Sequence, residues 1–133
     1  MGTVYLALHP ELGFEVAIKV LVAGRNASPD QRKRFQREIG ALGKLQHPGI
    51  VNIIDLGEER GLPWFAMRRV EGGSLEDRLR TQGPLSSSET IELGLQLCAA
   101  LNFVHAGGIL HRDLKPDNVL CTSSGDYILT ISA

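Results

Sequence analysis

Runs of apolar and β-branched residues in the first half of the chain predict short β-strands. Val4–Leu8 and Phe14–Val20 lie on either side of a segment that contains proline and glycine, which predicts a hairpin. Val51–Leu56 and Trp64–Met67 form a second pair around another turn of this kind. The first two runs therefore predict a hairpin, and the other two predict strands joined by a turn.

Helical spacing and capping residues predict helices in other stretches. Ser28–Gln31 is a capping box with proline at the first helical position, followed by one apolar stripe. A second capping box, Ser86–Glu89, opens a long helix that ends at Gly107-Gly108. Ser74 is a candidate N-cap for a short helix over Leu75–Arg80. The residues of the first stripe are Phe35, Ile39, Leu42 and Leu45.

The long helix is apolar over most of its circumference, and we expect it to be buried. Polar residues interrupt the stretch Ile91–Leu110, so it is interpreted as a helix followed by a turn and not as a membrane span. Its apolar positions are Ile91, Leu95, Leu97, Cys98, Leu101 and Val104.

Composition and charge indicate one domain in a reducing compartment. The chain has 133 residues, of which 43% are hydrophobic, enough to bury a core. Lys and Arg number 14 and Asp and Glu 15, so the near-zero net charge gives no support for binding nucleic acid or an anionic membrane. Cys98 and Cys121 have neither metal-ligand nor C-x-x-C spacing. The first residues do not form a signal peptide, and a cytoplasmic location is expected.

The stretch His111–Leu120 concentrates the candidate chemistry. Asp113 can accept a proton from an attacking hydroxyl, Lys115 can hold a phosphate, and Asn118 can give an oxygen to Mg²⁺. A polar surface turn is the plain alternative. However, the stretch matches the catalytic-loop pattern H-R-D-L-x-x-x-N at every fixed position. The chain therefore resembles the protein kinase family.

Two further motifs support this resemblance. Val16–Lys19 reads V-A-I-K, the family's strand motif, and Gly2–Val4 fits the last three positions of its Gly-rich loop. Glu38 lies on the first predicted helix, 19 residues after Lys19, where the family has the glutamate that pairs with this lysine. A solvated glutamate on a charged helix face is the alternative for Glu38.

The resemblance implies ATP as cosubstrate and Mg²⁺, with Mn²⁺ possible, as the metal. Met67 is then the gatekeeper, the backbone of Arg68 and Val70 contacts adenine, and Ser74 reaches the ribose. Arg68-Arg69 departs from the family's usual acid–aromatic pair. The catalytic residues implied are Asp113, Lys115 and Asn118. The ATP-binding residues implied are Gly2, Val4, Ala17, Lys19, Glu38, Met67, Arg68, Val70, Ser74 and Leu120.

The resemblance also implies an α+β, two-lobe fold. Residues 1–67 would form the small lobe with its antiparallel sheet, 68–74 the hinge, and 75–133 part of the helical large lobe. Lys115 matches the serine/threonine subclass, which implies protein substrates with a Ser or Thr acceptor.

The pattern breaks at the carboxyl end. The metal-binding D-F-G should occupy Ile131–Ala133, and Ile131 cannot ligate a metal. The chain is thus interpreted as a kinase domain incomplete at both ends, inactive or weak as it stands. One alternative is a pseudokinase-like fragment that binds nucleotide, or binds a protein through the long helix. The other is a remnant with no fold of its own.

Overall fold

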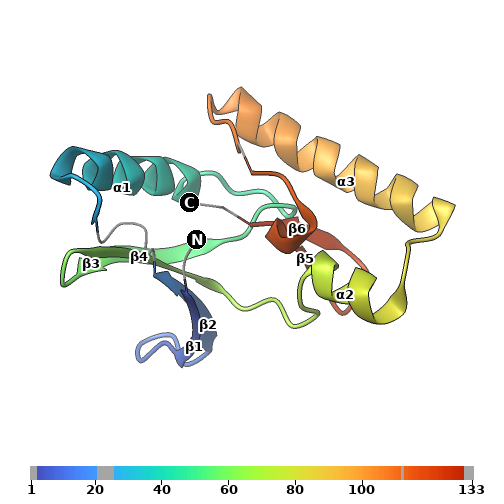
Figure 1. The fold of residues 1–133 in the computed structure, drawn as a ribbon, viewed down its shortest axis with the longest axis horizontal. Coiled ribbons are helices and arrows are strands. Elements are labelled where there is room, and N and C mark those ends of the chain that lie inside the picture. Colours follow the sequence, from blue (N-terminus) through green and yellow to red (C-terminus); the bar gives the residue numbers. More distant parts are fainter. Residues whose placement is uncertain (1–2, 21–25, 112, 131–133) are drawn as a thin grey trace. The chain divides into compact units, whose positions relative to one another are not determined.

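The computed structural model describes residues 3–20, 26–111 and 113–130, which fall into two compact units (Figure 1). The first unit contains the described residues up to 45, together with 52–69. The second contains 46–51 and the described residues from 70 onward. Within these ranges, no helix is long and apolar enough to cross a lipid bilayer.

A four-stranded sheet forms the centre of the first unit, as the sequence predicts. Its strands are β1 (Thr3–Leu8), β2 (Glu15–Val20), β3 (Ile53–Glu59) and β4 (Leu62–Arg68). They lie in the order β1-β2-β4-β3, and all neighbours are antiparallel. The two residues between β3 and β4 have φ angles of 50° and 77°, which is the geometry that a tight hairpin turn requires.

The strand β3 begins later than the sequence predicts. Val51 is expected within it, but the strand starts at Ile53. The Val51 N–H donates instead to the carbonyl of Leu129 at 2.9 Å, and the Leu129 N–H donates to the carbonyl of Gly49 at 2.8 Å. Gly49 and Val51 therefore pair within the second unit, to which residues 46–51 belong, through a long-range contact that local pattern does not reveal.

Helix α1 (Pro29–Gly43) packs against β3 and β4. The Ser28 hydroxyl accepts the Gln31 N–H at 3.2 Å, and the Gln31 side chain accepts the Ser28 N–H at 2.8 Å, so the predicted capping box is confirmed. Arg32 donates to the carbonyl of Gly61 at 3.0 Å and so anchors the helix to the β3–β4 turn. The buried core of this unit comprises Val16, Ile39, Pro63, Phe65, Ala66 and Met67.

The second unit combines helices with a small hairpin. Its elements are α2 (Leu75–Gln82), α3 (Ser87–Ala106), one turn of 3-10 helix (Pro116–Asn118), β5 (Val119–Cys121) and β6 (Tyr127–Leu129). The predicted long helix is thus confirmed. The buried apolar residues are Ile50, Val51, Leu75, Ala100, Val104, Val119, Cys121, Tyr127 and Leu129.

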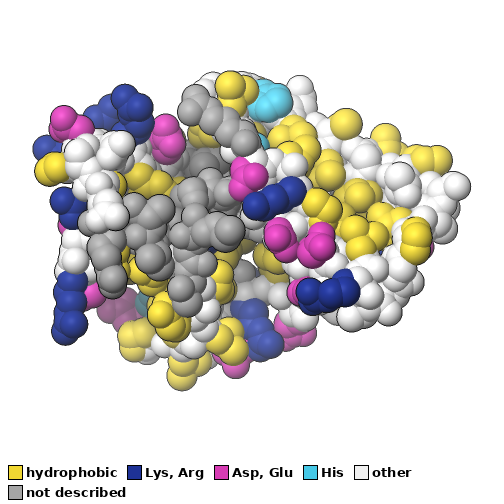
Figure 2. Space-filling view, viewed as in Figure 1, with side chains coloured by type: hydrophobic (Ala, Val, Ile, Leu, Met, Phe, Trp, Pro, Cys, Tyr) yellow, Lys and Arg dark blue, Asp and Glu magenta, His cyan; other side chains and the backbone are white. Residues whose placement is uncertain are grey.

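The helix α3 is buried along only part of its circumference. Ala100 and Val104 are 1% and 2% exposed, whereas Ile91 and Leu95 are 64% and 63% exposed and Cys98 is also exposed. Hydrophobic side chains gather over the surface where α3 lies (Figure 2). The predicted burial is wrong for Ile91, Leu95 and Cys98, because the described elements that pack on α3, such as β6, cover its other side.

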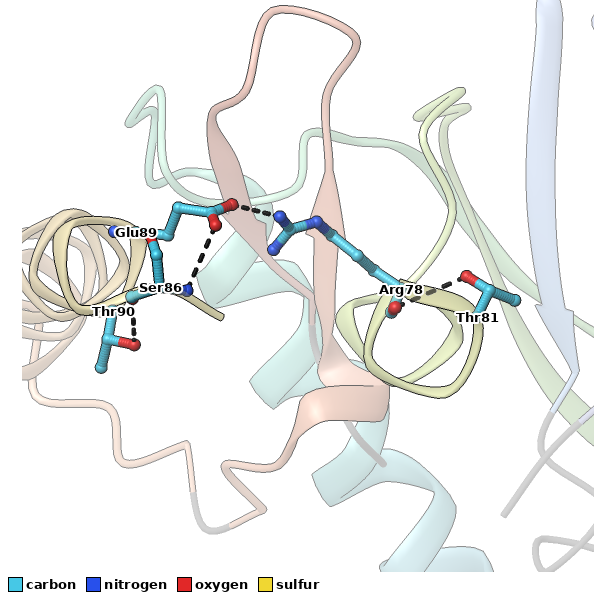
Figure 3. Close-up of polar contacts among 5 residues, drawn as sticks. All are labelled: Arg78, Thr81, Ser86, Glu89 and Thr90. Atoms are coloured by element: carbon cyan, nitrogen blue, oxygen red, sulfur yellow. Dashed lines mark hydrogen bonds and ion pairs between the residues drawn. The ribbon is translucent and has the colours of Figure 1, made fainter. Parts of the chain in front are cut away.

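A polar clasp joins α2 to the start of α3 (Figure 3). Ser86 and Glu89 form the predicted capping box, and Arg78 on α2 forms an ion pair with the Glu89 carboxylate. The pKa of Glu89 lies below its ordinary value. The largest cause is the Ser86 N–H, followed by the Ser86 hydroxyl and the Arg78 guanidinium. The clasp fixes where α3 starts relative to α2 inside this unit.

Candidate active site

Strand register places four of the predicted nucleotide-binding residues in the first unit. Directly opposed residues of an antiparallel pair lie on the same face of the sheet. Val4 lies opposite Lys19, and Ala17 lies opposite Met67. Since Ala17 and Lys19 are two residues apart on β2, all four share one face. Phe65, which is fully buried, lies opposite Lys19 on that face.

The two arginines at the end of β4 have partners near the start of β2. The Arg68 guanidinium lies over the ring of Phe14, 5.2 Å from its centroid. Arg69 forms an ion pair with Glu15. The Arg68 N–H also donates to the carbonyl of Asn52 at 3.2 Å. The residues that depart from the family pattern at the predicted hinge therefore hold its first part in place.

The predicted roles of three positions stay predictions. Glu38 is exposed on α1, next to the buried Ile39, and its pairing with Lys19 stays a prediction. Gly2 and Ile131 lie outside the described residues.

In the second unit, His111 links two segments through both nitrogens of its ring. Its Nε2 lies 2.6 Å from the carbonyl oxygen of Thr130, which can only accept. Its Nδ1 accepts the Asp113 N–H at 3.2 Å. The two contacts together require a neutral imidazole that carries its proton on Nε2. His111 thereby connects the predicted catalytic loop to Thr130, the residue that follows β6.

Asn118 closes this arrangement into a ring of hydrogen bonds. Its side-chain Nδ2 donates to the Asp113 carbonyl at 2.8 Å and to the Asp113 carboxylate at 3.3 Å. Its carbonyl accepts the Thr130 N–H at 2.8 Å. Asn118 and Thr130 are each only 6% exposed. We name His111, Asp113, Asn118 and Thr130 the loop ring; it fixes both the backbone and the carboxylate of Asp113.

Lys115 extends from the same loop toward Asp113. Its Nζ lies 3.5 Å from the Asp113 carboxylate, and the two side chains are 45% and 43% exposed. A half-exposed ion pair of this kind contributes little stability. The pair places a cation beside the carboxylate that the sequence predicts to accept a proton.

Asn118 can provide a metal with one oxygen. Its amide nitrogen donates to Asp113, so the amide oxygen is the atom with which it can bind a cation. No group of three or more His, Cys, Asp or Glu residues in the described part of the chain is arranged to hold a metal ion.

Ser74 and Leu120 lie together in the second unit. They form an antiparallel bridge, and Leu120 is the middle residue of β5. The Ser74 hydroxyl accepts the Asp77 N–H at 3.1 Å, which confirms Ser74 as the N-cap of α2. Because a hydroxyl also carries a proton to donate, capping does not prevent a contact with a ribose.

Sequence reasoning missed the positioning roles of His111 and Thr130. His111 belongs to the recognised motif, and that is the signal that could have identified it. Thr130 contributes its backbone N–H and carbonyl to the loop ring. Any residue can offer a backbone N–H and carbonyl, so the identity of residue 130 does not reveal these contacts, and the structure was needed to find the loop ring.

Comparison with known proteins identifies the family of this chain. The family described as "Protein kinase domain" matches residues 1–132. Serine/threonine-protein kinase PknH of Mycobacterium tuberculosis is 40% identical over 122 residues, 92% of this chain and 20% of that protein. PknB of Mycobacterium leprae is 39% identical over 128 residues, 93% of this chain and 21% of that protein. PknJ of Mycobacterium tuberculosis is 39% identical over 134 residues, 99% of this chain and 23% of that protein. The chain thus spans about a fifth of the length of these relatives, and it belongs to the protein kinase family.

Proposed function

We propose that this chain carries the nucleotide-binding and catalytic-loop residues of a serine/threonine protein kinase. The reaction is transfer of the ATP γ-phosphoryl group to a Ser or Thr hydroxyl of a protein. The observation that carries the proposal is the loop ring, which holds Asp113 and Asn118 together with Lys115 beside them. The named relatives, all serine/threonine kinases, support the substrate class.

The nucleotide roles fall on residues of both units. Lys19 would orient the α- and β-phosphates, and Glu38 would hold Lys19. Val4, Ala17 and Leu120 would contact adenine on its two faces, with Met67 as the gatekeeper. The backbone of Arg68 and Val70 would hydrogen-bond adenine, Ser74 would reach the ribose, and Gly2 would belong to the loop over the phosphates. Residues 1–67, 68–74 and 75–133 would then be small lobe, hinge and part of the large lobe.

In the transfer step, Asp113 would orient the acceptor hydroxyl and take its proton. The hydroxyl oxygen forms a bond to the γ-phosphorus as the bond from that phosphorus to the bridging oxygen breaks, and ADP leaves. Lys115 would neutralise charge on the transferred group. A divalent metal, when bound, would neutralise phosphate charge, with Asn118 as one ligand. The proposed location is the cytoplasm.

A second candidate is nucleotide or protein binding without catalysis. Ile131 at the expected D-F-G position favours it, because loss of one preorganised electrostatic group typically lowers the rate by about 10²–10³. The exposed apolar positions of α3, including Ile91 and Leu95, favour it as well. We therefore expect the 133-residue chain to bind ATP but to show little or no phosphate transfer.

Calorimetric titration with ATP and Mg²⁺, followed by transfer of labelled phosphate to a generic protein substrate, tests both candidates. Binding that Lys19→Met weakens supports the nucleotide site. Transfer that Asp113→Asn abolishes would establish the chain itself as a kinase and refute the second candidate. A folded chain that binds no ATP contradicts the nucleotide site.

A further inference from the structure

The segment Gly72–Ser74 lies against β5 like an additional short strand. The Cys121 N–H donates to the carbonyl of Gly73 at 2.8 Å, and Ser74 forms the bridge with Leu120. Cys121, at the end of β5, is 8% exposed. We name Gly72–Ser74 with Leu120 and Cys121 the β5 clip.

The two glycines of the β5 clip are required for different physical reasons. Gly73 has φ of +74°, a conformation that side chains with a Cβ rarely adopt. Gly72 is required for space: a Cβ there would lie 2.0 Å from the carbonyl oxygen of Cys121 and 2.7 Å from its carbonyl carbon. Both atoms are backbone, so no rotamer change relieves the clash. An alanine at 72 must displace β5 or the segment itself.

The β5 clip joins the two proposed contacts of the nucleoside. Ser74 begins α2 and is the proposed ribose contact, and Leu120 is the proposed adenine contact. Val119, the first residue of β5, directly follows Asn118 of the loop ring. A displacement of Cys121 should therefore also move Leu120, its neighbour in the chain, and it lies only three residues from Asn118.

We propose that Gly72 is a positioning residue for nucleoside binding, acting through the register of Ser74 against Leu120. This inference rests on the proposed nucleotide site. Gly72 itself touches no ligand. Its role is to let the backbone of the segment after the hinge approach β5 closely enough for the bridge to form.

The test compares ATP and adenosine binding by calorimetry in Gly72→Ala and Lys19→Met. We expect Gly72→Ala to weaken both ligands by the same factor, about tenfold or more. Lys19→Met should weaken ATP and leave adenosine unchanged, because Lys19 would contact phosphates only. Gly83→Ala is the matched control: Gly83 has φ of +78° at the end of α2, but no described residue other than its chain neighbours has an atom within 4 Å of an added Cβ. It should lose stability and keep adenosine affinity.

The affinities of the wild-type chain and of Gly72→Ala show whether the nucleotide site or only this inference fails. If the wild-type chain binds neither ligand, the proposed nucleotide site fails, and this inference with it. If the wild-type chain binds both and a folded Gly72→Ala chain binds adenosine equally well, only the inference fails. The amide exchange rate of Cys121 reports the β5 clip without ligand and should rise in Gly72→Ala. Adding Cys121→Ala to Gly72→Ala should not restore binding, because the clash is with backbone; restoration would overturn the proposal.

Discussion

We call the candidate residues of the first unit the strand-borne half and those of the second unit the loop-borne half, and different means hold each of them in place. In the first unit, Val4, Ala17, Lys19 and Met67 share a face because regular strand pairing puts them there. In the second unit, Asp113 and Asn118 lie outside the strands and depend on the loop ring. A strand-borne residue is positioned by a whole ladder, whereas a loop residue is positioned by a few specific bonds. We therefore expect that the strand-borne residues are displaced only when packing is lost. The loop-borne residues should be displaced when a single polar partner is removed.

The largest effect is expected where packing supports the strand-borne half. Phe65 is 0% exposed and lies opposite Lys19, so Phe65→Ala leaves a cavity beneath the sheet. The free energy of unfolding should fall by about 3–5 kcal/mol. Urea denaturation followed by circular dichroism measures it. Tyr5→Ala, which removes an aromatic side chain that is 56% exposed on the same sheet, should change stability by about 0.5 kcal/mol or less. Equal losses in the two variants would contradict the assigned core.

The loop-borne half should respond to the loss of one side-chain amide. Asn118→Ala removes the donor to the Asp113 carbonyl at a position that is 6% exposed. The variant loses two part-buried hydrogen bonds, and loss of one typical hydrogen bond costs about 0.5–1.5 kcal/mol. The same denaturation experiment measures the loss, and the Asp113 amide signal in an NMR spectrum should shift. Asn102→Ala, at an exposed position within α3, is the control and should be neutral or slightly stabilising.

The difference between the halves also explains how far the sequence alone could lead. Strands, capping boxes and helix ends depend on neighbouring residues, so Ser28, Ser86 and the Gly107-Gly108 stop could be recognised directly. The face shared by Ala17 and Lys19 follows from strand periodicity. The loop ring and the β5 clip depend on backbone atoms brought together from distant positions, as with Thr130 and Gly72.

The helix α3 shows a second limit of prediction from sequence. Its apolar positions were recognised correctly, but a pattern states only that a face is apolar and not which neighbour covers it. The pattern therefore predicted burial for Ile91 and Leu95, which are exposed. The predicted start of β3 was wrong for the same kind of reason, because the sequence does not show that Val51 pairs with Leu129 instead of continuing the strand.

A smaller effect is expected at the helix cap that precedes the loop-borne half. Ser86→Ala removes the hydroxyl that accepts the Glu89 N–H at 3.1 Å. Loss of such a cap lowers stability by about 1 kcal/mol. Ser87→Ala provides the control, because Ser87 is exposed and is the first helical residue rather than the cap. Thermal unfolding of both variants measures the difference; a loss in Ser87→Ala as large as in Ser86→Ala would show that the cap is not its source.

The smallest effect concerns the charge of Glu89, and its sign follows from the direction of the pKa shift. The Ser86 N–H, the Ser86 hydroxyl and Arg78 hold the pKa of Glu89 below the ordinary value of 4.5, so folding favours the charged form. This stability is fully present above pH 4.5 and is lost as pH falls through the lowered pKa of the folded state.

Glu89→Gln keeps an oxygen for the capping box but removes the charge that pairs with Arg78. The melting temperature of the variant should lie slightly below that of the wild type at neutral pH, and the two should converge in acid. Glu76→Gln, at an exposed acid of α2, controls for the change in net charge. A difference between Glu89→Gln and wild type that persists unchanged into strong acid would mean that the charge of Glu89 contributes nothing to the clasp.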